Sequence, residues 1–316
     1  MGITLLSFFV LSLTVLQFKN YAQNEISAVK AKPIKFGATY MTLNNPFFDL
    51  IDSELRNVIE ANGDVLTTMD PQLSIERQRE QVRYLIEQGC QVLIVNPVDS
   101  KGLADVLKEA KKQGIYIIAI DTNVYESDSF VDYSVVSDNY EAGVLCAQKM
   151  MAQKKEANIF LLKHESAHSA VERIQGFKDT IKGNANYRIV GEEECEGQLE
   201  KSMPIIKGKL EDKLEFDVVM ALNDPSALGA IAALQEKDML SNVMVYGVDG
   251  TPEAKVLVRD GFLQGTVAQY PKKMAKKAID AAYQFLDGKR YVKKEKIDVV
   301  MIDQNNISEF SLEGWQ

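Results

Sequence analysis

Residues 91–121 read QVLIVNPVDSKGLADVLKEAKKQGIYIIAID, and this stretch decides the fold class. Gln91 to Val95 and Ile115 to Ile120 are short apolar runs, which are typical of strands buried on both faces. Between them, apolar residues recur at helical spacing from Leu103 to Ala110, and Gly114 ends the expected helix. A buried strand, a helix and a second buried strand in this order predict a parallel sheet covered by helices.

The same alternation continues on both sides of this stretch. We expect further strands at Ile34 to Tyr40, Val65 to Met69, Ile159 to Lys163, Tyr187 to Val190, Phe216 to Leu222, Met244 to Val248, Leu263 to Ala268 and Ile297 to Ile302. Amphipathic helices separate them, one opened by a Ser74 cap, one by Asp224 as the cap with Pro225 as the first helical residue, and one spanning Pro271 to Leu286. Because crossovers in parallel sheets are right-handed, the predicted fold is α/β with two doubly wound parallel-sheet lobes.

The connection between the two halves predicts more than one crossing of the chain. Tyr133 to Asn139 is extended in character and contains neither Gly nor Pro. A strand-like crossover fits this composition better than a loose linker does. We therefore expect two similar lobes joined by several hinge segments.

The N-terminal region, residues 1–32, differs from the rest of the chain. Ile3 to Leu16 is a nearly unbroken apolar run, and its length suits the core of a signal peptide better than a membrane span. No Lys or Arg precedes the run, and Ala22 is the best candidate for the last residue removed. We expect a signal peptide or an uncleaved anchor followed by a linker, and hence export to the periplasm or the outer face of the cell envelope. The alternative is a first core helix.

The bulk composition excludes some classes of function. The chain has 316 residues and a formal net charge of −9, with both signs of charge interspersed. Nucleic acid is not expected as a partner, because phosphate neutralisation requires clustered Lys and Arg. Cys90, Cys146 and Cys195 are odd in number and lack metal-ligand spacing, so neither a disulfide framework nor a metal site is predicted from them.

Polar and aromatic residues that follow the expected strands are candidates for a binding site, because ligands bind at the carboxyl ends of such strands. The main candidates are Asn45, Phe47, Phe48, Asp121, Arg173, Asn223, Asp249 and Gln269, with Tyr40, Met41, Thr122 and His168 as secondary candidates for the lining of a pocket. Carboxylates, amides and a guanidinium suit the hydroxyls of a sugar, and adjacent aromatic rings suit its apolar faces. The alternative is that the Asp and Asn residues only cap helices and that Phe47 and Phe48 begin a core helix face.

His164 to His168 reads HESAH and matches the H-E-x-x-H signature of zinc peptidases. That chemistry needs both histidines on one face of a helix. Here His164 ends an expected strand and the next helix is expected to begin near His168, so the two rings would not share a face. We expect no metal, no cofactor and no catalytic residue.

Eight short segments carry a resemblance to a known family. In order, they are TLNNPFF at 42–48, IVNPVDS at 94–100, AID at 119–121, SDN at 137–139, ERIQGF at 172–177, ALNDPSALGA at 221–230, VYGVDGTPE at 245–253 and TVAQYP at 266–271. Together they resemble the ribose-binding protein family of bacterial ABC sugar transporters, which has the type I periplasmic binding protein fold. The resemblance covers about residues 33–303.

The resemblance implies a hinge of three segments, near Ser137-Asp138, Gln269-Tyr270 and Asp298-Val299. It therefore implies an N-terminal lobe of residues 33–137 with 270–297, and a C-terminal lobe of residues 138–269 with 298–316. It also implies roles in the pocket. Asn45 and Asp121 would bind hydroxyls, Phe47 and Phe48 would pack on the ring, and Arg173, Asn223, Asp249 and Gln269 would complete the site.

Two departures from the family concern the ligand. Ribose binders usually have Arg directly after the Asp at 121, where this chain has Thr122. They also have an aromatic residue where this chain reads Glu196-Gly197-Gln198. Both changes alter the size and polarity of the pocket. The sequence therefore predicts a small sugar or polyol as the ligand and does not identify it as D-ribose.

The expected protein is a monomer that closes around a small, ribose-like monosaccharide and delivers it to an ABC importer. The alternative is a polyol-binding or autoinducer-binding carrier that presents its ligand to a chemoreceptor or sensor kinase. A sugar-responsive repressor would need a basic helix-turn-helix before the first strand, where this chain has an apolar run. An enzyme is not expected, because no Ser-His-Asp set and no phosphate loop is recognisable.

Overall fold

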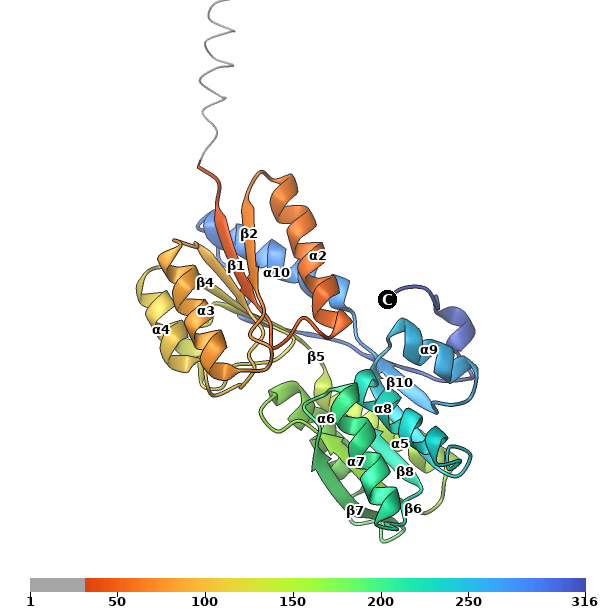
Figure 1. Cartoon of the computed structure of the whole chain (residues 1–316). Coiled ribbons are helices and arrows are strands. Elements are labelled where there is room, and N and C mark those ends of the chain that lie inside the picture. Colours follow the sequence, from red (N-terminus) through yellow and green to blue (C-terminus); the bar gives the residue numbers. More distant parts are fainter. Residues whose placement is uncertain (1–31) are drawn as a thin grey trace, which may run out of the picture.

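The buried strand β3 (Val92–Val95) lies inside a six-stranded sheet whose two faces are covered by helices, which explains why its four residues are all buried. The computed structural model describes residues 32–316 and consists of two α/β lobes (Figure 1). The predicted signal peptide or anchor, residues 1–31 of the expected N-terminal region, lies outside the described residues.

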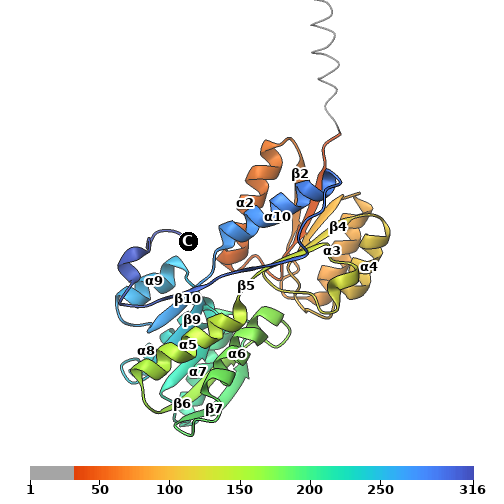
Figure 2. The same cartoon turned by 180° about the vertical axis from the view of Figure 1, so that it is seen from behind.

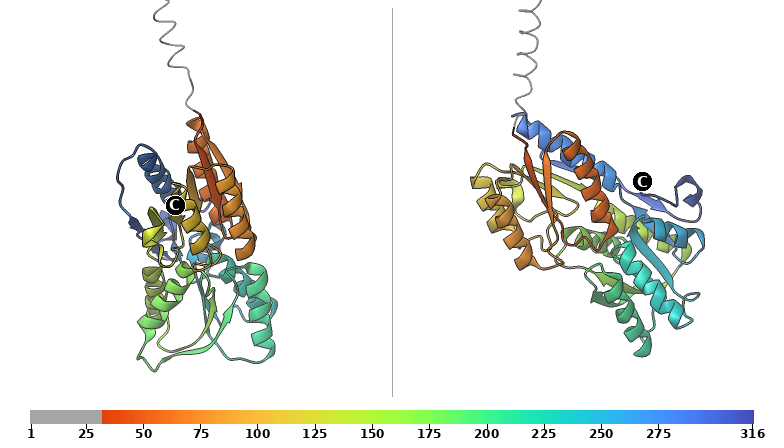
Figure 3. Two further views of the ribbon diagram at one scale, coloured as in Figure 1. Left: turned by 90° about the vertical axis from the view of Figure 1, so that its left-hand side faces the viewer. Right: turned by 45° about the horizontal axis from the view of Figure 1, so that its top comes forward.

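The first lobe contains a fully parallel sheet of strand order β11-β5-β4-β3-β1-β2. Its other strands are β1 (Lys35–Thr39), β2 (Val65–Met69), β4 (Tyr116–Ile120), β5 (Tyr133–Ser137) and β11 (Lys294–Ile297). Its helices are α2 (Pro46–Ala61), α3 (Ile75–Glu87), α4 (Ala104–Lys112) and α10 (Pro271–Leu286). Helix α2 packs against α10, and α3 packs against α4 on the other side of the sheet (Figure 3).

The second lobe repeats this arrangement with strand order β12-β10-β9-β8-β6-β7, in which only β12 is antiparallel to its neighbour. Its strands are β6 (Ala157–Lys163), β7 (Tyr187–Glu194), β8 (Val218–Ala221), β9 (Met244–Asp249), β10 (Gly265–Ala268) and β12 (Val300–Ile302). Its helices are α5 (Asn139–Gln153), α6 (His168–Ile181), α7 (Leu199–Glu211), α8 (Asp224–Glu236) and α9 (Pro252–Arg259). The predicted fold class is therefore confirmed.

The chain crosses between the two sheets three times. It leaves β5 for α5 at Asp138, leaves β10 for α10 at Gln269 and Tyr270, and leaves β11 for β12 at Asp298 and Val299. These crossings lie side by side between the lobes (Figure 2). The expectation of a single last strand from Ile297 to Ile302 is wrong, because the apolar run spans a crossing and its two ends pair in different sheets.

Local signals explain where the elements begin and end. Ser74 caps α3 as expected, its Oγ accepting from the Arg77 amide at 3.2 Å. The cap of α8 is Asn223 rather than the expected Asp224, because the Asn223 side chain accepts from the Ser226 amide and Asp224 already has helical geometry. Strand β7 runs four residues beyond the expected Val190, through a polar Gly-Glu-Glu-Glu stretch at the sheet edge, where buried apolar side chains are not required.

No helix within residues 32–316 is both long enough and apolar enough to cross a lipid bilayer.

Candidate functional site

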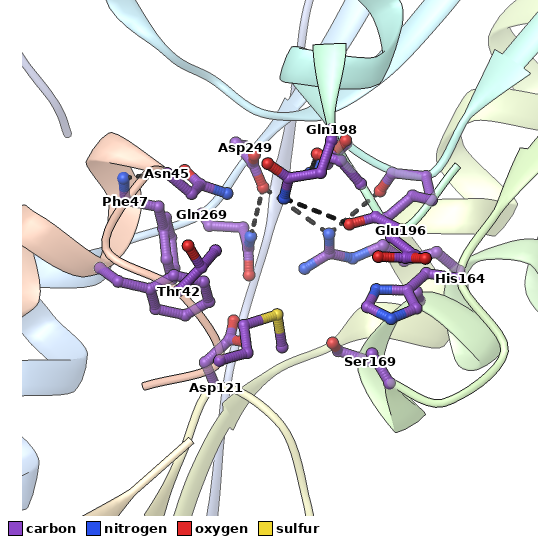
Figure 4. Close-up of a pocket in the computed structure, with 18 residues that line it drawn as sticks. Thr42, Asn45, Phe47, Asp121, His164, Ser169, Glu196, Gln198, Asp249 and Gln269 are labelled. Atoms are coloured by element: carbon purple, nitrogen blue, oxygen red, sulfur yellow. Dashed lines mark hydrogen bonds and ion pairs between the residues drawn. The ribbon is translucent and has the colours of Figure 1, made fainter. Parts of the chain in front are cut away.

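A cavity lies between the lobes, at the carboxyl ends of the strands of both sheets. Its wall consists of Met41, Thr42, Asn45, Phe47, Phe48, Asp121, His164, Ala167, Ser169, Ala170, Arg173, Glu196, Gly197, Gln198, Leu222, Asn223, Asp249 and Gln269 (Figure 4). All eight main candidates from the sequence lie in this wall, and so does Met41.

The first lobe contributes an aromatic wall at the start of α2. Asn45 caps this helix, its Oδ1 accepting from the Phe47 amide at 3.0 Å. Phe47 and Phe48 occupy the first helical turn, and their rings meet edge to face with centroids 5.4 Å apart. Asn45 is thus both a cap and a cavity residue, and the two rings are both helix core and cavity wall.

Tyr40 does not line the cavity, contrary to the expectation. Its ring is fully buried beside that of Phe48, with centroids 6.0 Å apart, and its hydroxyl donates to Asp52 at 3.3 Å. Tyr40 follows the last residue of β1 and points into the helix layer, so it supports Phe48 instead of meeting a ligand.

Asp121 follows β4 and has a φ of +66°, a backbone conformation that Asp tolerates better than most residues. Its Oδ2 accepts from Asn96 Nδ2 at 3.1 Å and from Thr122 Oγ1 at 3.0 Å. Burial raises the pKa of Asp121, and the charge of Arg173 opposes the shift. Thr122 itself is absent from the wall, because its hydroxyl faces Ser169 of the other lobe, with the two oxygens 2.6 Å apart.

Arg173 is the one Lys or Arg in the wall. Its Nε donates to Asn139 Oδ1 at 2.8 Å and its Nη1 donates to the Leu222 carbonyl at 3.0 Å. The position of Arg173 depends on close packing of α5 against α6, since a Cβ on Gly143 would lie 1.9 Å from the Arg173 carbonyl oxygen. Two glycines, Gly143 and Gly176, therefore allow the helix approach that fixes this guanidinium.

Asp249 ends β9 with a φ of +139°, a conformation that costs about 1–3 kcal/mol for a residue with a side chain. Its Oδ1 accepts from Gln269 Nε2 at 2.7 Å and lies 3.6 Å from Arg173 Nη1. Among the described residues, neither Asp249 Oδ2 nor Gln269 Oε1 has a hydrogen-bond partner, although both atoms are buried. Burial raises the pKa of Asp249 well above its ordinary value, with Arg173 opposing.

A second layer supports the wall behind Asp249. Asp224 accepts from the Thr251 amide at 2.8 Å and from Thr266 Oγ1 at 2.6 Å, and burial raises its pKa to about 6. Asn223 is occupied by structure as well, because its Oδ1 accepts from the Ser226 amide and its Nδ2 donates to the Gly197 carbonyl at 3.0 Å. Both residues thus hold loops in place, and Asn223 also faces the cavity.

The two histidines have different surroundings. His164 lines the cavity, and its Nε2 lies 2.7 Å from Ser166 Oγ, while burial lowers the pKa of the ring. His168, a secondary candidate, is not in the wall, because its ring packs against Tyr125 with centroids 4.9 Å apart. Strand β6 ends at Lys163 and α6 begins at His168, so the two histidines do not share a helix. Residues 32–316 contain no group of three or more His, Cys, Asp or Glu side chains that could hold a metal ion.

Sequence reasoning missed the contribution of the C-terminal tail, residues 303–316. The Trp315 ring packs against Phe47 of the first lobe with centroids 5.6 Å apart. Gln316 Nε2 donates to the carbonyls of Asp249 at 3.2 Å and Gly250 at 3.1 Å. Lys255 of α9 anchors the tail by donating to the carbonyls of residues 311 and 314. The tail therefore joins the second lobe to the aromatic wall of the first, and no hydrophobic periodicity reveals it.

The lobes touch on both sides of the cavity. On one side, the Ser100 amide donates to the Ser166 carbonyl at 3.0 Å, and the His168 amide donates to Ser100 Oγ at 3.0 Å. On the other side, Asn44 Nδ2 donates to Glu200 at 3.3 Å. The structure therefore has the closed arrangement of the two lobes.

Two α/β lobes that close on a polar cavity, across three chain crossings, define a two-lobed binding protein of the type I periplasmic class. The chain belongs to the periplasmic binding protein family, whose domain model matches residues 36–290. The family consists of solute-binding proteins that bind sugars and are not enzymes.

Individual relatives place the chain near the ribose-binding group, as predicted. The ribose import binding protein of Bacillus subtilis is 29% identical over 291 residues, which cover 91% of this chain and 93% of that protein. Its counterpart from Escherichia coli is 28% identical over 263 residues, covering 83% and 88%. Among solved structures, the Caulobacter myo-inositol binding protein with bound myo-inositol has a TM-score of 0.83 at 25% identity, covering 89% of this chain and 97% of that chain.

Proposed function

We propose that this protein is an exported, monomeric solute-binding protein that encloses one small monosaccharide or polyol and delivers it to an ABC importer. The observation that carries the proposal is the cavity between the lobes, in which polar groups that are buried in the closed form face an enclosed space without a protein partner. Such groups are costly to bury unless a ligand completes their hydrogen bonds.

The wall has the composition that a polyhydroxylated ring requires. Carboxylate and amide oxygens accept from hydroxyls, and the amides and Arg173 donate to them. Phe47 and Phe48 offer apolar surface to the C–H faces of the ring. Relatives named for ribose and myo-inositol support this ligand class. D-ribose itself is not proposed, because Thr122 stands where ribose binders usually have Arg, and its hydroxyl bonds across the cleft to Ser169.

Closure of the hinge gives the mechanism. In the open form each lobe would expose its half of the wall to solvent. A sugar that bonds to Asp121 of the first lobe and to Arg173 and Asp249 of the second stabilises the closed form, because only there are all its hydrogen bonds made. The importer would then recognise the closed arrangement of the lobe surfaces.

A thermal-shift screen over pentoses, hexoses, deoxy sugars and polyols tests the proposal. A ligand that binds only the folded chain stabilises it by about 2.7 kcal/mol at a concentration of a hundred times Kd, so a true ligand raises Tm. The Arg173→Ala variant serves as the control for binding in this cavity and is expected to lose the shift. A screen in which no sugar or polyol raises Tm contradicts the proposal.

A further inference from the structure

The corner of the cavity formed by Asp249 and Gln269 contains two buried hydrogen-bond acceptors that have no partner among the described residues. Asp249 is 2% exposed and Gln269 is 1% exposed. The hydrogen bond from Gln269 Nε2 to Asp249 Oδ1 fixes the orientation of the amide, so Gln269 Oε1 turns away from the carboxylate and toward the cavity (Figure 4). The two unpartnered atoms are therefore a carboxylate oxygen and an amide oxygen.

A hydroxyl satisfies such a corner only in part. Each hydroxyl brings one donor together with two acceptor lone pairs, whereas an ammonium brings up to three donors and no acceptor. Gln269 Nε2, Arg173 Nη1 and Arg173 Nε each already donate one hydrogen bond to a protein oxygen. An ammonium placed against Asp249 Oδ2 and Gln269 Oε1 therefore uses both free acceptors and adds no unsatisfied lone pair.

The charges around the cavity point the same way. The wall contains two aspartates, Asp121 and Asp249, and one guanidinium, that of Arg173. Burial raises the pKa of both aspartates, and an ammonium beside Asp249 would favour its ionised form. Glu196 also lies in the wall, and its carboxylate pairs with Lys201. Behind the wall, the carboxyl of Asp224 lies in the field of the buried Lys255 ammonium.

Resting on the proposed function, we propose that the natural ligand is an amino sugar or amino polyol whose ammonium binds Asp249 Oδ2 and Gln269 Oε1, while its hydroxyls bind the rest of the wall. The ligand then brings a second cationic group to a wall that has two aspartates and one guanidinium. The Arg173 guanidinium does not exclude it, because that group approaches Asp249 through Oδ1, at 3.6 Å, and not through Oδ2.

The test compares sets of ligands that differ in one group. Each set contains a parent sugar, its 2-amino-2-deoxy derivative and the N-acetylated derivative, in the gluco, galacto and manno series, and a fourth set contains myo-inositol and an inosamine. Calorimetric titration at pH 7 is expected to give, for at least one set, binding of the amino member at least tenfold tighter than binding of its hydroxyl parent. The acetylated member is expected to bind more weakly than the amino member, because acetylation removes the charge.

The isosteric Asp249→Asn variant provides the second readout. It keeps an oxygen for Gln269 but removes the negative charge, so the preference for the amino member over its parent is expected to fall at least tenfold. Asp260→Asn is the control, because it removes one negative charge from an exposed position of the same lobe that pairs with Arg259. This control is expected to leave the preference unchanged.

The outcomes separate this inference from the proposed function. If a neutral parent binds as tightly as its amino derivative in every set that binds, the proposal of an ammonium group in the ligand is wrong and the sugar-binding function stands. An unchanged preference in Asp249→Asn likewise overturns the assignment of the ammonium to this corner. If no member of any set binds, the proposed function fails and this inference fails with it.

Discussion

At the scale of single residues, the two cavity aspartates share an unusual backbone. Asp121 and Asp249 both have positive φ, at +66° and +139°. Strained backbone of this kind persists where the surrounding structure holds the residue firmly in place, and it is typical of functional sites. Asp121 directly follows β4 and Asp249 is the last residue of β9, and both carboxylates line the cavity.

Asp249→Ala and Arg173→Ala are each expected to lower the affinity for the sugar at least tenfold. The first removes an acceptor and the second removes the guanidinium opposite it, and loss of a hydrogen bond to a charged group costs about 1.5–3 kcal/mol. Calorimetric titration of both variants measures the loss, and circular dichroism checks that they fold. Titration curves equal to that of the unmodified protein would remove both residues from the site.

Asp224→Asn is expected to gain stability relative to the unmodified, ligand-free protein as pH rises. Burial raises the pKa of Asp224 from 3.8 to about 6, so the stabilising contribution of its protonated form is complete below pH 3.8 and is lost as pH rises through about 6. A shift of about two units corresponds to about 3 kcal/mol. Asn does not titrate. The unfolding free energy of the variant minus that of the unmodified protein, measured with urea, should therefore increase between pH 4 and pH 7. A difference that does not depend on pH would show that Asp224 is ionised in the folded protein throughout.

Sequence position alone located Asp249 and Arg173 in the cavity wall. Asp249 follows one expected strand and Arg173 lies in the helix that follows another, and the carboxyl ends of parallel strands meet at one edge of a sheet. It failed for Tyr40, which has the right place in the sequence but points into the helix layer beside Phe48. It also failed to place His164 in the wall. The sequence shows His164 only as part of the HESAH motif, and nothing in the local pattern shows which way a residue at a strand end points.

At the scale of elements, the packing of α5 on α6 positions the guanidinium of the site. Gly143 and Gly176 lie where the helices meet, and a Cβ on either would lie 1.9 or 2.1 Å from a backbone oxygen of the other helix. The helices approach closely only because both positions lack a side chain.

Gly143→Ala is expected to destabilise the protein and to weaken sugar binding together. The added methyl group forces α6 and Arg173 away from α5, and overpacking of this kind costs about 1–3 kcal/mol. Gly208→Ala in α7 is the matched control, because nothing lies within 4 Å of its added Cβ and alanine favours a helix by about 0.5–1 kcal/mol. Tm and affinity measured for both variants check the account. Equal effects of the two substitutions would contradict it.

The C-terminal tail joins elements of the two lobes. Trp315→Ala is expected to weaken sugar binding two- to tenfold, because the ring packs on Phe47 in the closed form and aromatic pairs contribute about 0.5–1.5 kcal/mol. Phe262→Ala removes an exposed aromatic ring from the second lobe and should leave the affinity unchanged. If Trp315→Ala leaves the affinity unchanged as well, the tail does not contribute to closure.

Periodicity predicted the order of strands and helices because buried strands and amphipathic helices have distinct repeats. It could not predict that Ile297 to Ile302 belongs to two strands, since a chain crossing between sheets carries no local signal when it stays extended and apolar. The contacts of the tail have no sequence signal for a related reason. Residues 303–316 form almost no regular structure, and side chains that bond to main-chain carbonyls hold them in place.

At the scale of the whole molecule, the central claim is that two lobes close on one sugar. The Ser100 amide contacts the Ser166 carbonyl on one side of the cavity and Asn44 contacts Glu200 on the other, and we expect both contacts to break when the lobes open. They are weak individually, so the sugar must provide most of the free energy that favours closure.

Small-angle X-ray scattering with and without the sugar found in the thermal-shift screen tests this claim most directly. The account predicts a smaller radius of gyration at saturating sugar in the unmodified protein, and no change for Arg173→Ala at the same sugar concentration. Calorimetry on the same sample should show one sugar bound per chain. An unchanged radius of gyration in a sample that calorimetry shows to be saturated would contradict the closure of the two lobes.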